Sequence, residues 1–275
     1  MTVTRLCFGT STFAAGRLIP DKDSGPGIAA LAAAVDAGIR MIHSNPKLQT
    51  QWAIREALSR VHEDVRIRHV VKVELPLGAS EHEACELIHA RLTQSAQNLG
   101  IDRVDAVTIE IDLKRTRDRA LLVDVDALTA FYDFTAKQVA SFGGQPTVFA
   151  YCHSPAHLDA CLRTTQIGGF AAQYNPVEAW PGLYLDRIAL SDRPFLAMAP
   201  LRRSLLVDTA APTARDRLRS LRWVLGHPAV TAAVITISSS EHLLEVIDAA
   251  QHPLRLDQVR QHLEAWRHAP VPNQP

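Results

Sequence analysis

The chain has 275 residues, 47% of them hydrophobic, and carries 29 Lys plus Arg against 29 Asp plus Glu. A chain of this length can bury a large core. Its balanced charge provides no global field to attract nucleic acid or an anionic membrane, so neither partner is expected. The N-terminus lacks a signal-like pattern and no apolar run is long enough to span a bilayer, so we expect a cytoplasmic location.

Short β-rich runs alternate with helical patterns along the whole chain, which is typical of parallel strands joined by crossover helices. The expected strands are residues 5–11, 39–44, 69–75, 106–112, 147–152, 169–174, 194–201 and 232–238. The expected helices are residues 28–37, 50–59, 83–99, 125–141, 155–163, 214–225 and 241–250. This order predicts the α/β class and a closed (β/α)8 barrel, the TIM-barrel fold.

The C-terminal region contains a further amphipathic stretch at residues 256–266, followed by a Pro-rich tail. We expect this stretch to form a helix packed outside the barrel. No linker rich in Gly, Ser or Pro divides the chain, so residues 1–275 are predicted to form a single domain. The cysteines and most histidines show no metal-ligand spacing, so we expect reduced thiols and no metal site.

Five segments, in chain order, resemble segments of the aldo/keto reductase family. They are FGTST, AAVDAGIRMIHS, QYNPVE, MAPL and ITISSSEHLLEVI, beginning at residues 8, 33, 173, 198 and 235. The order of predicted elements resembles that family along nearly the whole chain. The resemblance implies a barrel enzyme that reduces carbonyl compounds with NADPH through a tetrad of Asp, Tyr, Lys and His.

Only one member of that tetrad is present at the matching positions. The resemblance places the Asp at His43, the Tyr at Leu48, the Lys at Lys72 and the His at Glu110. The tyrosine would donate a proton to the carbonyl oxygen, and leucine has no ionisable proton to give. Ordinary reductase chemistry is therefore not expected.

The cofactor positions implied by the resemblance are also altered. The residues that depart from the family pattern are Tyr151 and Met198 at the nicotinamide end, and Thr236 or Ile237, His242 and Val246 at the adenine end. The residues that match are Gln173, Ser238, Ser239 and Glu245, the last three being cofactor-binding only if NADPH is bound. No cofactor is favoured, and NADPH is the alternative.

Side-chain alternation predicts which polar residues share one pocket. If Lys72 points into the barrel, then so do other residues of the same parity near the C-terminal strand ends. These are His43, Glu74, Glu110, Asp112, Tyr151, His153, Gln173 and Asn175. An unpaired ammonium inside a barrel is costly, so we expect Lys72 to face Glu110 or His43.

A lysine, a carboxylate and an imidazole in one pocket favour acid–base catalysis. We assign catalysis to Lys72 and Glu110, with His43 and Tyr151 in support; Lys72 can alternatively form a Schiff base. The candidate substrate-binding residues are Gln173, Asn175, His153, Asp112, Arg202 and Arg203. The alternative for Lys72 and Glu110 is a residual ion pair. For Arg202 and Arg203 it is a pair of solvated loop charges.

Three functions remain open from the sequence. The first is a divergent aldo/keto reductase-like enzyme that performs non-redox chemistry, of lyase, isomerase or cyclase type, on a small organic molecule. The second is an NADPH-dependent reductase with a replacement acid, and the third is a non-catalytic barrel that binds a ligand or a partner. The oligomeric state is left open.

Overall fold

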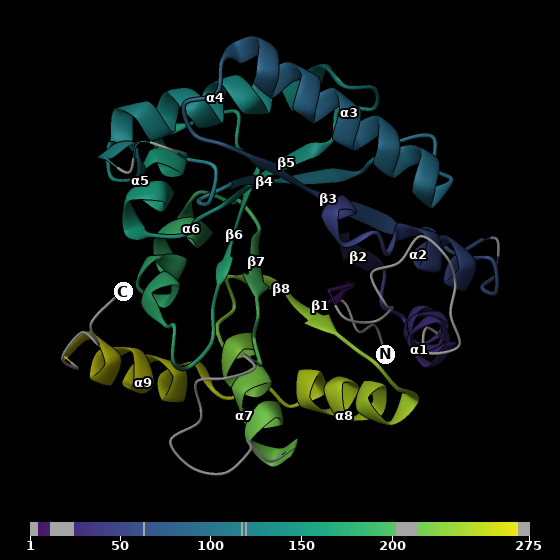
Figure 1. Cartoon of the computed structure of the whole chain (residues 1–275). Helices are drawn as coiled ribbons and strands as arrows, with labels where there is room; N and C mark the ends of the chain where they lie inside the picture. The colour runs from purple at the N-terminus through teal and green to yellow at the C-terminus, as the bar shows by residue number, and fades with distance from the viewer. Residues whose placement is uncertain are drawn as a thin grey trace.

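The computed structural model describes residues 5–11, 25–62, 64–116, 118, 120–201 and 214–268. Within them, eight parallel strands form a closed barrel in the order β1 to β8, surrounded by helices (Figure 1). The strands are β1 (Leu6–Gly9), β2 (Met41–Ser44), β3 (Arg68–Leu75), β4 (Ala106–Ile111), β5 (Thr147–Tyr151), β6 (Gly169–Gln173), β7 (Phe195–Met198) and β8 (Val230–Thr236). The predicted (β/α)8 fold is confirmed.

Helices follow the strands on the outside of the barrel. They are α1 (Gly25–Asp36), α2 (Gln51–Leu58), α3 (Glu81–Leu99), α4 (Val125–Ser141), α5 (Pro155–Arg163), α6 (Leu185–Leu190), α7 (Ala214–Leu225), α8 (Ser240–Gln251) and α9 (Leu256–His268). Helix α6 was not expected from the sequence, because six residues are too few to show a helical period. None of the described helices combines the length and the apolar character that crossing a membrane requires.

Six of the eight expected strands are shorter in the structure, most clearly β1 and β7. Strand β1 covers Leu6–Gly9 and not 5–11, and β7 covers Phe195–Met198 and not 194–201. Strand β7 ends where Ala199 adopts a φ of 47°, a left-handed conformation that an extended strand cannot contain. The residues at and after this turn, Ala199 to Leu201, line the pocket described below.

The core has two layers because side chains alternate along each strand. The barrel interior contains Cys7, Val70, Ala106, Phe149, Tyr151, Ala171, Leu196, Ala232 and Val234. A larger cluster lies between the strands and the helices. The sequence analysis expected residues of the same parity as Lys72 to face the barrel interior. This is observed, since Val70 and Tyr151 point inward.

The surroundings of Gly169 show that the barrel interior is closely packed. A Cβ built on Gly169 would lie 2.5 Å from Cε1 of Phe149 and 3.0 Å from the carbonyl oxygen of Pro194. We expect Gly169→Ala to lower the free energy of unfolding by roughly 1–3 kcal/mol, because neither the ring nor the backbone can move without repacking. Urea unfolding checks this. Gly143→Ala is the matched control because a Cβ placed on Gly143 would have no other atom within 4 Å, and equal effects would contradict the prediction.

Candidate active site

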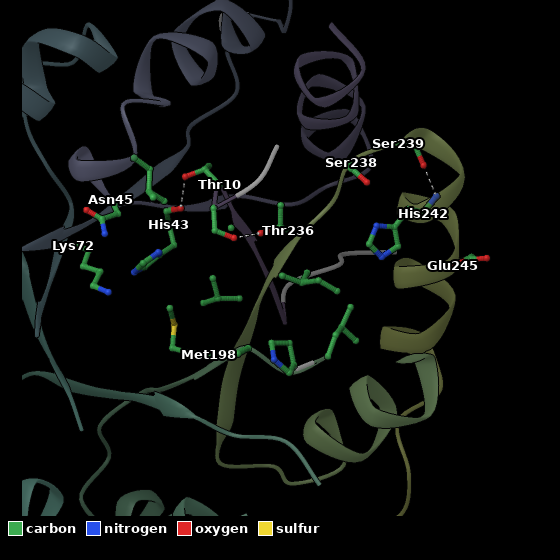
Figure 2. A pocket seen from close by; sticks show the side chains of 18 of the residues that line it. Thr10, His43, Asn45, Lys72, Met198, Thr236, Ser238, Ser239, His242 and Glu245 are labelled. Carbon is green, nitrogen blue, oxygen red and sulfur yellow. Dashed lines mark hydrogen bonds between the residues drawn. The ribbon is translucent and has the colours of Figure 1, made fainter. Parts of the chain in front are cut away.

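A cavity of about 810 Å³ opens at the C-terminal ends of the strands. Lys72 and His43 lie at one end, and Ser238, Ser239 and His242 lie at the other (Figure 2). Its remaining lining comes mainly from the ends of β1, β7 and β8, including Thr10, Met198 and Thr236. The cavity is therefore an elongated groove with a cationic amine at its inner end.

Of the two partners that the sequence left open for Lys72, the structure pairs it with Glu110 and not with His43. Its Nζ contacts Oε2 of Glu110 and lies 3.4 Å from Oε1 of Glu74. The three side chains are only 14 to 17% exposed. On its other side the amine lies 5.3 Å from the ring centroid of Tyr151, a cation–π arrangement. Two carboxylates and an aromatic face thus stabilise the ammonium form of Lys72.

The ion pair belongs to a longer charged network that the sequence reasoning missed. Lys47 Nζ lies 2.5 Å from Glu74 Oε2 and 3.1 Å from Asp112 Oδ2. Asn45 Nδ2 donates to Glu74 Oε1 at 2.8 Å. Lys47 belongs to the 3₁₀ turn Pro46–Leu48 that follows β2, next to the leucine at the expected tyrosine position. The position of Lys47 directly before Leu48 in the sequence was the signal that could have identified it as a site residue.

The network keeps the two interior carboxyl groups ionised. Burial raises the pKa of Glu110, but the neighbouring His153 ring and the charge of Lys72 outweigh burial, and the pKa is lowered. Burial also raises the pKa of Glu74, but Lys47, Lys72 and Asn45 outweigh burial and lower this pKa below its usual value. Glu110 is therefore a carboxylate that holds Lys72 in place.

His43 is buried and has an unused ring nitrogen. Its side chain lines the cavity, the residue is 6% exposed, and Nε2 has no hydrogen-bond partner among the described residues. Burial, and next the charge of Lys72, lower its pKa to about 4, against a smaller opposite effect of Glu110. The imidazole is neutral at pH 7, and an unsatisfied buried polar group costs about 1–3 kcal/mol. Because Nε2 is itself buried, a ligand in the groove would satisfy it only after the ring turns toward the groove.

Tyr151 lines the inner end of the groove, beside Lys72. Burial, followed by the charge of Glu110, raises the pKa of its phenol, which therefore stays protonated. Gln173, whose amide acts in the opposite direction on the pKa of Tyr151, is not among the cavity-lining residues. Where the resemblance places a small serine, the structure has a large ring beside Lys72.

The remaining predicted substrate-binding residues are distributed around the site. His153 Nε2 lies 3.3 Å from Glu110 Oε1, behind the ion pair. Asp112 is bound by Lys47 and does not line the cavity. Asn175 also lies outside the lining: it donates to the carbonyl of Ala199 and accepts from two backbone amides, so it holds a loop. Arg202 and Arg203 lie outside the described residues.

The outer end of the groove lies against α8. Ser239 Oγ accepts a hydrogen bond from the His242 amide at 3.2 Å and so caps the helix. Ser238, Ser239 and Glu245 line the groove, although the Glu245 carboxylate points away from the other labelled side chains (Figure 2). Glu241 adds a second carboxylate, and the described lining here has no Lys or Arg.

Metal chemistry has no support in the described part of the chain. Its His, Cys, Asp and Glu side chains form no group of three or more that is arranged to hold a metal ion.

Comparison with known proteins finds relatives only at the level of structure. No family model and no curated protein sequence matches the chain. The glycerol dehydrogenase of Gluconobacter oxydans has a TM-score of 0.71 at 17% identity, over 98% of this chain and 94% of that chain. An aldo-keto reductase of Klebsiella pneumoniae in complex with NADPH has a TM-score of 0.66 at 19% identity, over 98% and 93%.

A third similar structure is the holo form of an aldo-keto reductase from Bacillus halodurans. Its TM-score is 0.69 at 17% identity, over 98% of this chain and 94% of that chain. At these identities the likeness shows the fold. The barrel fold that the sequence resemblance implies is thus confirmed.

Proposed function

We propose that this chain is a divergent enzyme of the aldo/keto reductase superfamily that catalyses proton transfer on a small carbonyl compound without a redox step. The observation that carries this proposal is the pairing of a neutral imidazole with an ammonium at the inner end of the groove. Nε2 of His43 has no partner there among the described residues, and Lys72 is held as a cation by Glu110 and Glu74. A base and an acid are available together at neutral pH.

In the proposed reaction Lys72 donates a proton to the carbonyl oxygen, and Nε2 of His43 removes a proton from the adjacent carbon. The C–H electron pair forms the carbon–carbon double bond, and the carbonyl π pair forms the new O–H bond. Return of the proton to a different carbon completes an isomerisation, and loss of a β-substituent with its electron pair gives an elimination. Atoms and charge balance without an oxidant or a reductant.

The ion pairs argue against the Schiff-base alternative for Lys72. A nucleophilic amine must be neutral, whereas two carboxylates beside Nζ stabilise the ammonium form. Tyr151 is also a weak replacement acid because burial raises the pKa of its phenol. Lys72 is therefore assigned as the acid, Glu110 as the residue that positions it, and Tyr151 as a wall of the site.

An NADPH-dependent reductase is the second candidate. The Klebsiella reductase is in complex with NADPH, which makes NADPH the first cofactor to test here. The groove also extends from Lys72 to α8, as a dinucleotide would require. The side chains fit NADPH poorly: Tyr151 fills the nicotinamide end, and Glu241 and Glu245 line the outer end without a described cation. We therefore derive no step through it.

The two candidates are separated by an experiment that needs no known substrate. The protein is incubated in D₂O with a panel of small aldehydes and ketones, and exchange of the hydrogens next to the carbonyl is followed by NMR. We expect exchange without added dinucleotide, and its loss in Lys72→Met and in His43→Gln. Micromolar NADPH binding with carbonyl-dependent NADPH oxidation, and no exchange, would establish the reductase instead. Neither activity across the panel would overturn both.

A further inference from the structure

A second cavity lies at the opposite end of the barrel from the groove. It has a volume of about 560 Å³ and is lined by four arginines, Arg40, Arg66, Arg68 and Arg103. These residues stand at or just before the first residues of β2, β3 and β4. In a parallel barrel the N-terminal strand ends lie together, so the four side chains gather on the face that usually serves stability alone.

Three of these guanidinium groups have no partner in the part of the chain that the structure describes. Arg66, Arg68 and Arg103 make no side-chain hydrogen bond or ion pair with any described residue. Elsewhere in the described chain, several arginines pair with carboxylates. Examples are Arg60, Arg187, Arg222, Arg255 and Arg260. Single arginines on other surfaces also lack a described partner, but this cavity gathers three such guanidinium groups at one concave place.

The local structure holds the cationic side chains together against their repulsion. Arg68 donates its backbone amide to the carbonyl of Arg40 at 2.8 Å, so these two residues are fixed side by side. The Arg40 guanidinium donates to the carbonyls of Val35 and Ile39, at the end of α1. Gly144, at a φ of 92°, packs against Arg103: a Cβ there would lie 3.2 Å from Cβ of Arg103.

One carboxylate, that of Asp105, also lines the cavity, but its single negative charge does not balance the charge of the four arginines. Asp105 accepts a hydrogen bond from the His69 backbone amide at 2.9 Å through Oδ2. The lining residues therefore retain an excess of three positive charges. Like charges held close together cost free energy, and a bound anion would recover it. Guanidinium groups bind phosphate oxygens in a bidentate manner.

We propose that this cavity binds a small anion that carries two or more phosphate groups, through Arg66, Arg68 and Arg103 with Arg40 beside them. The excess positive charge matches such an anion, and the volume lies within the range of small-molecule sites. The balanced charge of the whole chain favours a small ligand over nucleic acid. The site does not depend on the function proposed for the groove.

The test titrates inorganic triphosphate into the full chain at low ionic strength by calorimetry. We expect saturable binding at one site, and a Kd about tenfold higher or more in Arg66→Ala/Arg103→Ala, because charge-assisted bidentate contacts are lost. Arg60→Ala/Arg222→Ala is the control, since it removes the same charge from paired surface positions. Lys72→Met should bind triphosphate as the wild type does.

Several results would overturn the proposal. An equal loss of affinity in the control variant would mean diffuse electrostatic attraction. Equal binding of sulfate and triphosphate at matched ionic strength would mean that the anions only screen the charge of the arginines. Weakening by Lys72→Met alone would place the triphosphate in the groove. Much tighter binding of a short single-stranded RNA than of triphosphate would identify a different class of ligand.

Discussion

Lys72→Met should abolish turnover and lower the free energy of unfolding by about 3–5 kcal/mol, the usual effect of removing one partner of a buried ion pair. The substitution leaves the carboxylates of Glu110 and Glu74 inside the barrel without their shared cation. Methionine preserves much of the length of lysine, so loss of charge dominates over loss of packing. Urea unfolding and the exchange assay measure the two effects.

A double variant separates the structural role of Lys72 from its chemical role. Lys72→Met/Glu110→Gln removes both charges of the closest pair, and we expect it to be more stable than Lys72→Met alone while remaining inactive. Glu110→Gln alone should retain partial activity, because Glu74 still lies 3.4 Å from Nζ. Full turnover in Lys72→Met would refute its assignment as the acid.

His43→Gln should reduce turnover by about 10²–10⁴, the usual contribution of a general base, without destabilising the fold at pH 7. The reason is that Nε2 of His43 makes no hydrogen bond to any described residue. In the wild type kcat/KM should fall as the pH drops through about 4, where the imidazole becomes protonated. His252→Gln, at an exposed position after α8, is the control.

The same substitution should change how stability depends on pH. The pKa of His43 is about 4 in the folded protein against 6.5 for the unperturbed group, so the unfolded chain binds the proton more tightly. Stability is therefore complete above pH 6.5 and is lost as the pH falls toward 4. This shift corresponds to about 3 kcal/mol. His43→Gln should remove that part of the acid sensitivity, and an unchanged stability profile would show that His43 titrates normally.

The sequence predicts the barrel because its signals are local. Each strand and its following helix show their own period of apolar residues, and eight repeats of this pattern admit a closed parallel sheet. The contact between Lys72 and Glu110 follows from the same reasoning. Neighbouring strands in chain order are neighbours in space, and side-chain alternation places both residues inside.

The sequence alone determined the fold class and the inward parity of the strand residues, and it limited the partner of Lys72 to Glu110 or His43. Only the tertiary structure showed that Lys47 joins the resulting ion pair, that Asn175 holds a loop, and that a ring nitrogen of His43 lacks a partner among the described residues. It alone gathered the arginines at the opposite end. These features depend on loop conformations and on contacts between distant segments, and neither leaves a periodic pattern in the chain.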